Sequence, residues 1–161
     1  MGTIFSQNQL QDRIQFWRTE KKSVVFTNGC FDILHRGHIE YLKKAKTLGD
    51  ILIIGLNSDS SVKIIKGKNR PYMEQDDRAY ILSHLIFVDA VCIFDEETPY
   101  HMIETVKPDF LVKGGDYNAE DVVGKDIVEK YGGKVVIFPF VAGYSSSQII
   151  NKIRENNTQG I

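Results

Sequence analysis

Two histidines separated by an arginine and a glycine are the residues of this sequence best suited to chemistry. His35-Arg36-Gly37-His38 follows the apolar run Val24-Val25-Phe26 and leads directly into a stretch with helical spacing. The segment predicts two imidazoles at the N-terminus of a helix, where free backbone N–H groups and the helix dipole already favour an anion. Imidazole N–H groups add donors, and Gly37 lets a phosphate approach the backbone. We therefore expect a phosphate site at this turn.

A basic segment lies further along the chain, after the second apolar run. Lys63, Lys66, Lys68 and Arg70 fall within eight residues that contain no acid. A charge run of this kind is often only a solvated loop. Its glycine and its position favour a mobile flap that closes over an anionic substrate.

Arg78 draws attention because it lies in the first turn of a predicted helix, where the helix dipole disfavours a cation. The neighbouring acids Asp76 and Asp77 could balance its charge. We favour the other explanation, which is a phosphate partner for Arg78.

Polar and glycine-rich segments follow the ends of other predicted strands. In an open parallel sheet, ligands bind outside the carboxyl ends of the strands, where the strand order reverses. Near the C-terminus, a serine before an apolar helix is an ordinary N-cap, but three consecutive hydroxyls predict a second oxyanion cradle. The segments are Thr27-Asn28-Gly29, Asn57-Ser58-Asp59, Asp95-Glu96, Lys113-Gly114-Gly115-Asp116 and Gly143-Tyr144-Ser145-Ser146-Ser147.

The turn after the first predicted strand could bind ligands other than a phosphate held by histidines. Cys30, Asp32, His35 and His38 could in principle supply four metal ligands, but their spacing matches no common zinc pattern. Neither GxGxxG after the first strand nor a Walker-type Gly-Lys-Ser/Thr sequence is present. A dinucleotide fold and a P-loop enzyme are therefore disfavoured.

The elements that must position these residues alternate between strand and helix. Continuous apolar runs rich in β-branched residues predict five strands buried on both faces, and segments with helical spacing separate them. This order predicts an α/β, doubly wound, Rossmann-like parallel sheet of five strands with helices on both faces. We expect a single domain over residues 1–161, with an N-terminal helical extension over 1–21 and a catalytic core over 22–155. The extra helix, from Asn8 to Glu20, could pack on the body or on a partner chain.

Composition narrows the possible partners. The chain has 161 residues, 42% hydrophobic and 25% charged content, and a formal net charge of −1, which argues against nonspecific nucleic-acid binding. Its two cysteines form neither a CxxC pair nor a disulfide framework. We see neither an export signal nor a membrane-spanning run, so a cytoplasmic enzyme is expected.

Gly29-Cys30-Phe31-Asp32 with His35-Arg36-Gly37-His38 resembles the signature of the cytidylyltransferase-like nucleotidyltransferases. Together with Asn57-Ser58-Asp59, Lys66-Gly67, Arg70-Pro71, Asp77-Arg78 and Leu111-Val112-Lys113-Gly114-Gly115-Asp116-Tyr117, it is similar more narrowly to the adenylyltransferases that act on D-glycero-β-D-manno-heptose 1-phosphate. This resemblance implies ATP, Mg²⁺, release of pyrophosphate and formation of ADP-heptose for the lipopolysaccharide core. Many relatives carry a sugar kinase as well, and the sequence predicts a stand-alone form without it.

The motifs and the resemblance together assign roles to residues. We expect catalytic roles for His35, His38, Lys66 and Arg78. Nucleotide contacts are expected from Asn28, Gly29, Cys30, Phe31, Gly37, Lys113, Gly114, Gly115, Asp116, Gly143, Tyr144, Ser145, Ser146 and Ser147. Substrate contacts are expected from Asp32, Asn57, Asp59 and Arg70, with no metal ligand from the protein and a homodimer as the assembly.

Two alternatives stay open. A cytidylyltransferase that uses glycerol 3-phosphate or another alcohol phosphate would perform the same chemistry. Relatives of that kind carry Arg-Thr-Glu where this chain has Phe140-Val141-Ala142, and Gln148 replaces a frequently basic residue, so charge compensation is weaker here. The other alternative is a nucleotide-binding protein without turnover.

Overall fold

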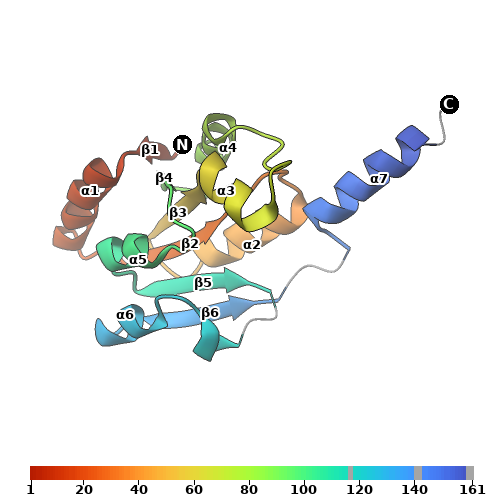
Figure 1. The fold of residues 1–161 in the computed structure, drawn as a ribbon. Helices are drawn as coiled ribbons and strands as arrows, with labels where there is room; N and C mark the ends of the chain where they lie inside the picture. Colours follow the sequence, from red (N-terminus) through yellow and green to blue (C-terminus); the bar gives the residue numbers. More distant parts are fainter. Residues whose placement is uncertain (116–117, 140–142, 159–161) are drawn as a thin grey trace.

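The computed structural model describes residues 1–115, 118–139 and 143–158. Within these residues, six parallel strands form one sheet in the order β1-β4-β3-β2-β5-β6 (Figure 1). The strands are β1 (Thr3–Phe5), β2 (Val24–Gly29), β3 (Ile51–Asn57), β4 (Ala90–Phe94), β5 (Phe110–Gly114) and β6 (Lys134–Phe138). The helices are α1 (Gln7–Thr19), α2 (Arg36–Lys46), α3 (Asp59–Lys66), α4 (Gln75–Ser83), α5 (Tyr100–Val106), α6 (Lys125–Lys130) and α7 (Ser146–Thr158), with a 3₁₀ turn at Ala119–Asp121.

This sheet confirms the predicted doubly wound α/β fold, with one more strand than expected. All five predicted strands are present, as β2 to β6. The strand that the sequence did not predict, β1, has three residues and pairs with β4, with Thr3 opposite Ala90. Three residues are too few for a hydrophobic period to be recognised. The N-terminal helix was predicted correctly, and it connects β1 to β2.

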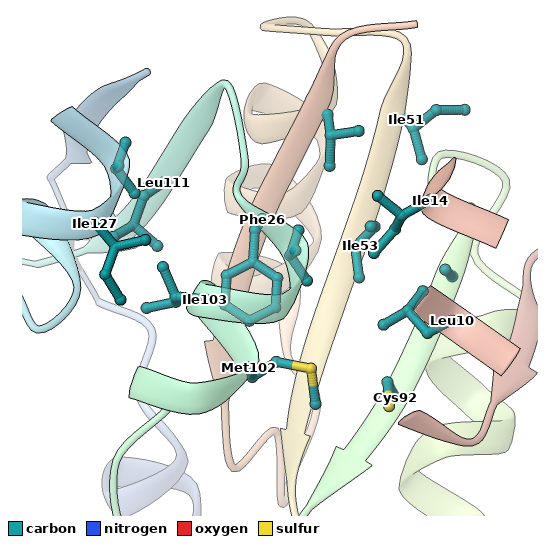
Figure 2. Close-up of a cluster of buried hydrophobic side chains, with 14 of the residues drawn as sticks. Leu10, Ile14, Phe26, Ile51, Ile53, Cys92, Met102, Ile103, Leu111 and Ile127 are labelled. Atoms are coloured by element: carbon teal, nitrogen blue, oxygen red, sulfur yellow. The ribbon is translucent and has the colours of Figure 1, made fainter. Parts of the chain in front are cut away.

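Two hydrophobic clusters, one on each face, hold the sheet between its helices. On one face, α1, α5 and α6 contribute Leu10, Ile103 and Ile127 to a cluster with Phe26 and the other inward-facing strand residues (Figure 2). On the other face, α2 and α4 contribute Leu42, Ala45, Ala79 and Leu82. Because the strands are covered on both sides, their sequences are continuously apolar rather than alternating.

Two segments differ from their predicted form. The spacing of apolar residues from Asp121 to Tyr131 predicts a single helix, but this segment contains only the last residue of the 3₁₀ turn and then α6. Between them Gly124 has a φ of +84°, a conformation in which any other residue would be strained. The flap expected around Lys63 and Lys66 is instead the last turn of α3, and only Lys68 and Arg70 belong to the following loop.

The order of the strands reverses beside β2. The chain moves from β2 to β3 and β4 on one side, and then returns to β5 and β6 on the other. The carboxyl ends of β2 and β5 therefore border a crevice, which is where open parallel sheets bind ligands. In the described part of the chain, no helix is long and apolar enough to cross a membrane.

Candidate active site

A cavity of about 490 Å³ opens at the carboxyl ends of β2 and β5. The start of α2, the end of α3 and the start of α7 complete its wall. Its lining residues are Asn28, Gly29, Cys30, Phe31, Asp32, His35, Gly37, His38, Tyr41, Lys44, Lys66, Arg70, Gly114, Phe138, Pro139, Gly143, Tyr144, Ser145, Ser146, Ser147 and Gln148. Most of the predicted site residues thus line one cavity.

The two histidines form a stacked pair at the start of α2. His35 is the N-cap residue, and its ring centroid lies 3.9 Å from that of His38, with the planes inclined by 31°. The backbone N–H of His35 donates to His38 Nδ1 over 3.4 Å. Since Nδ1 accepts this bond, a neutral His38 carries its proton on Nε2.

Burial sets the charge of the pair. Burial, with smaller contributions from His35 and Lys66, lowers the pKa of His38 to about 4. Burial also lowers the pKa of His35, whose Nδ1 is buried and has no hydrogen-bond partner among the described residues. At neutral pH His38 is an uncharged N–H donor rather than an imidazolium.

The turn before α2 is closely packed around this pair. A Cβ on Gly37 would lie 3.0 Å from the His35 ring and 3.1 Å from Tyr144 Cβ, so a larger residue would displace one of them. Phe31 adopts a left-handed conformation, with a φ of +43°, and its ring centroid lies 5.4 Å from that of His38. Burial raises the pKa of the Cys30 thiol, so it is protonated at neutral pH.

Asp32 lines the cavity, but its carboxylate is occupied by the protein. It accepts a hydrogen bond from Arg70 Nε at 2.6 Å and from the backbone N–H groups of Tyr72 at 2.7 Å and Met73 at 3.0 Å. Only 2% of Asp32 is exposed. We expected Asp32 to contact substrate; its position instead makes it the anchor of the loop that carries Arg70.

Arg70 and Lys66 provide positive charge on the α3 side of the cavity. With Nε held by Asp32, the Arg70 guanidinium keeps a buried Nη2 that has no hydrogen-bond partner within the described residues. Lys66 is exposed at the end of α3, and its charge contributes to the lowered pKa of His38. Both positions fit the predicted contacts with phosphate.

The start of α7 supplies the hydroxyl groups expected near the C-terminus. Ser146 Oγ donates to the carbonyl oxygen of Ile33 at 3.1 Å, which fixes α7 to the turn before α2. Ser145 Oγ accepts from the Gln148 backbone N–H at 3.1 Å, as an N-cap does. Two of the three serines thus stabilise the local structure while they line the cavity.

The catalytic role that we expected for Arg78 does not fit its position. Arg78 does not line the cavity, and only 1% of it is exposed. Its guanidinium donates to the carbonyl oxygens of Met73, Cys30 and Asn57, and to Asp59 Oδ1 at 2.7 Å. The charge is balanced structurally, although by Asp59 rather than by the neighbouring acids Asp76 and Asp77.

The substrate contacts expected from Asn57 and Asp59 are not supported either, because both residues lie outside the cavity lining. Asn57 is 3% exposed and its Nδ2 donates to Ser61 Oγ at 2.9 Å. Asp59 is the partner of Arg78. Both residues therefore hold the start of α3 in place.

Only part of the glycine-rich segment at the end of β5 lines the cavity. Gly114 lines the cavity, and a Cβ there would lie 3.1 Å from the Tyr41 ring. Lys113 and Gly115 do not line it, and Lys113 Nζ donates to Asn28 Oδ1. Burial lowers the pKa of Lys113 to about 8. Asp116, another predicted nucleotide contact, lies outside the described residues, as do residues 140–142.

The sequence analysis did not predict several residues that line the cavity, namely Tyr41, Lys44, Phe138, Pro139 and Gln148. A signal was available for two of them, because Tyr41 follows His38 by three residues on α2 and Lys44 follows Tyr41 by three, so each neighbours the one before it on the helix surface. No comparable signal marked Phe138 and Pro139, which reach the cavity only through the pairing of β6 with β5.

A protein metal centre is not supported by the described residues. Among them, no group of three or more His, Cys, Asp and Glu side chains is placed to hold an ion. Cys30, Asp32, His35 and His38 do share the cavity wall. The Asp32 carboxylate, however, already accepts three hydrogen bonds.

Comparison with known proteins identifies related chains. The bifunctional protein HldE of Syntrophotalea carbinolica is 51% identical over 154 residues, which make up 96% of this chain and 31% of that protein. HldE of Wolinella succinogenes is 51% identical over 151 residues, 94% of this chain and 31% of that protein. This chain thus spans about a third of the length of these relatives.

Solved structures agree with these matches. A lipopolysaccharide core biosynthesis protein from Thermoplasma volcanium has a TM-score of 0.61 and 32% identity, covering 74% of this chain and 97% of that one. Pantoate-beta-alanine ligase from Francisella tularensis has a TM-score of 0.62 over 96% of this chain and 78% of that one; at 18% identity it shares the fold alone. A family model described as cytidylyltransferase-like matches residues 26–155, from β2 into α7. The chain that places a histidine pair in the crevice beside β2 therefore belongs to the cytidylyltransferase-like family.

Proposed function

We propose that this protein is a nucleotidyltransferase that transfers AMP from ATP to D-glycero-β-D-manno-heptose 1-phosphate, giving ADP-heptose and pyrophosphate for the lipopolysaccharide core. The observation that carries the proposal is the pair of neutral imidazoles at the start of α2, inside a cavity that Lys66 and Arg70 also line. The choice of ATP and of a heptose 1-phosphate rests on the resemblance of the sequence motifs to heptose 1-phosphate adenylyltransferases. Similarity to a lipopolysaccharide core biosynthesis protein supports the lipopolysaccharide core as the destination of the product.

In this reaction a phosphate oxygen of the sugar 1-phosphate attacks the α-phosphorus of ATP. A new P–O bond forms, the bond from the α-phosphorus to the bridging oxygen breaks, and pyrophosphate leaves with the electron pair. The attacking phosphate is already anionic near neutral pH, so no general base is needed. The protein must therefore position two anions and stabilise the charge that develops between them.

The cavity residues are suited to these tasks. His38 Nε2–H and His35 would donate to the oxygens of the α-phosphoryl group in the transition state. Lys66 and Nη2 of Arg70 would neutralise charge on the phosphates that approach from the α3 side. Asp32 orients Arg70 for this contact.

Mg²⁺ would accompany the triphosphate rather than occupy a site made by the protein. Asp32 is the one carboxylate among the described lining residues, and its hydrogen bonds leave it poorly suited to a metal. Mg²⁺ readily binds substrate phosphates and retains several waters. When bound there, the ion would neutralise charge on the leaving pyrophosphate.

The test is pyrophosphate release with single pairs of nucleotide and acceptor. We expect release with ATP and heptose 1-phosphate, in the presence of Mg²⁺, and little with CTP and glycerol 3-phosphate. Release with CTP and an alcohol phosphate would replace the proposal with a cytidylyltransferase. Binding of ATP without release from any acceptor would favour a protein without turnover.

The role of His38 can be tested separately. His38→Ala should lower kcat about a hundredfold with little change in ATP affinity, because the lost donor acts mainly in the transition state. His101→Ala is a matched control, since His101 lies on α5 with a side chain that is 75% exposed and does not line the cavity. Equal turnover of the two variants would remove His38 from the mechanism.

The proposal also covers the cellular compartment of the enzyme and its oligomeric state. We infer a cytoplasmic reaction, because ATP is the donor. We also infer a homodimer, which sedimentation equilibrium of the purified protein tests through its molecular mass.

A further inference from the structure

Lys113 lies one residue before the end of β5 and is half-buried. It does not line the cavity, although the sequence analysis placed it among the expected nucleotide contacts. Its ammonium donates a hydrogen bond to Oδ1 of Asn28, near the end of the neighbouring strand β2. Asn28 does line the cavity. The two residues thus form a pair across the point where the strand order reverses.

The chemistry of lysine decides which way the Asn28 amide points. An ammonium group has three donors and no acceptor, so the atom of Asn28 that faces it must be the carbonyl oxygen. An unrestrained asparagine can present either its oxygen or its NH₂ group to a ligand. With Oδ1 bound to Lys113, the NH₂ group remains as the part of Asn28 available to a ligand.

We propose that Lys113 is a positioning residue that orients Asn28 as a hydrogen-bond donor to the phosphates of a bound nucleoside triphosphate. This deepens the proposed function, since it rests on ATP as the ligand. The wall next to Asn28 supports an anionic partner, because Gly29 follows it directly and His38, Lys66 and Arg70 line the same cavity. A carbonyl oxygen turned toward this cavity would repel the triphosphate.

Asn28→Asp is the sharpest test, because it replaces one NH₂ group by an oxygen of similar size and leaves an acceptor for Lys113. The fold should be retained, and ATP binding measured by calorimetry should weaken at least about tenfold, as expected when a donor to a charged group is lost. ATP binding within twofold of the wild-type value would overturn the proposal. Because binding is measured without acceptor, this result is independent of which sugar phosphate the enzyme uses.

A double-mutant cycle separates positioning from direct contact. Lys113→Met should weaken ATP binding about threefold to tenfold when Asn28 is present, and less than twofold in an Asn28→Ala background, because Lys113 acts only through Asn28. An equal loss in both backgrounds would mean that Lys113 contacts the ligand itself and would overturn the proposal.

Spectroscopy supplies a readout that does not depend on a ligand. The side-chain NH₂ resonances of Asn28 are assigned by their disappearance in Asn28→Asp, and they should shift in Lys113→Met. Unchanged resonances would show that Lys113 does not orient the amide. If wild-type protein binds ATP but releases no pyrophosphate with heptose 1-phosphate, the proposed function fails while the binding experiments still decide the role of Lys113.

Discussion

At the scale of single residues, burial keeps the chemistry of the histidine pair neutral. A buried imidazolium would attract a triphosphate more strongly, but it would have to be desolvated in the free protein. A neutral His38 avoids this cost and still offers Nε2–H as a donor, because its Nδ1 accepts from the His35 backbone. Most of the positive charge at the site is then left to Lys66 and Arg70.

His38 should therefore titrate far below the ordinary range. We expect an imidazole pKa near 4 in the ligand-free protein, with the Nε2–H tautomer above that pH. Since the folded pKa lies below the unfolded value of about 6.5, the unfolded state binds the proton first, and the stability that His38 provides is lost as pH falls from 6.5 toward 4. A ¹⁵N NMR titration, with the resonances of His38 assigned by their absence in His38→Ala, measures the pKa and the tautomer of its imidazole. A midpoint near 6.5 would contradict the buried, neutral pair.

Lys113 should affect stability in the alkaline range. Burial lowers its folded pKa to about 8, below the unfolded value of about 10.4. Between these values the unfolded chain retains a proton that the folded protein has released, so stability rises with pH. Urea unfolding of the wild type and of Lys113→Met, followed by Trp17 fluorescence from pH 7 to 10, isolates this contribution. The difference in unfolding free energy should grow in favour of the wild type above pH 8. A constant difference would argue against a buried ammonium.

At the scale of elements, Arg78 connects the ends of β2 and β3 with α3 and the loop before α4. One guanidinium binds three carbonyl oxygens and Asp59. Lysine cannot reproduce this planar arrangement of donors. Arg78 thus fixes the backbone on which Cys30 and the α3 side of the cavity are built.

Arg78→Lys should destabilise the protein by about 3 kcal/mol, because it leaves buried acceptors without partners. ATP affinity of the remaining folded protein should change little, since Arg78 does not line the cavity. Arg36→Lys is a control with a 67% exposed side chain and an exposed partner, Glu40, and its effect should stay below about 1 kcal/mol. Urea denaturation measures both variants. A large loss of ATP affinity with unchanged stability would restore the phosphate role that the sequence predicted.

These elements show where sequence reasoning succeeds and where it stops. Strands buried on both faces carry long apolar runs, so β2 to β6 could be predicted from the sequence, and the His35 to His38 turn was found because its residue types are unusual at a helix start. The length of β1 gave no periodic signal. The catalytic role predicted for Arg78 rested on the dipole of its own helix, whereas its guanidinium also donates to the carbonyl oxygens of Cys30, which follows β2, and of Asn57, at the end of β3.

At the scale of the whole molecule, the first 19 residues are part of the domain rather than an appendage. We expected an N-terminal extension that could pack on the body or on a partner. In the structure, β1 extends the sheet beside β4, and α1 buries Leu10, Ile14 and Trp17 on the face that α5 and α6 also cover. Figure 2 shows Leu10 and Ile14 in this cluster. The N-terminal helix thus packs on the body, which is one of the two possibilities that the sequence left open.

Leu10→Ala tests this integration. Leu10 is fully buried in the cluster that contains Cys92, so its truncation should leave a cavity and lower the unfolding free energy by about 3 kcal/mol. The cavity proposed to bind nucleotide lies at the carboxyl ends of β2 and β5, and α1 contributes none of its lining residues, so ATP affinity should stay within about twofold. Trp17, the single tryptophan of the chain, reports unfolding of α1, while circular dichroism reports the whole fold. Coincident transitions by both methods would show that α1 unfolds together with the catalytic domain. A separate early Trp17 transition, with the main transition unchanged in Leu10→Ala, would instead return α1 to the status of an independent extension.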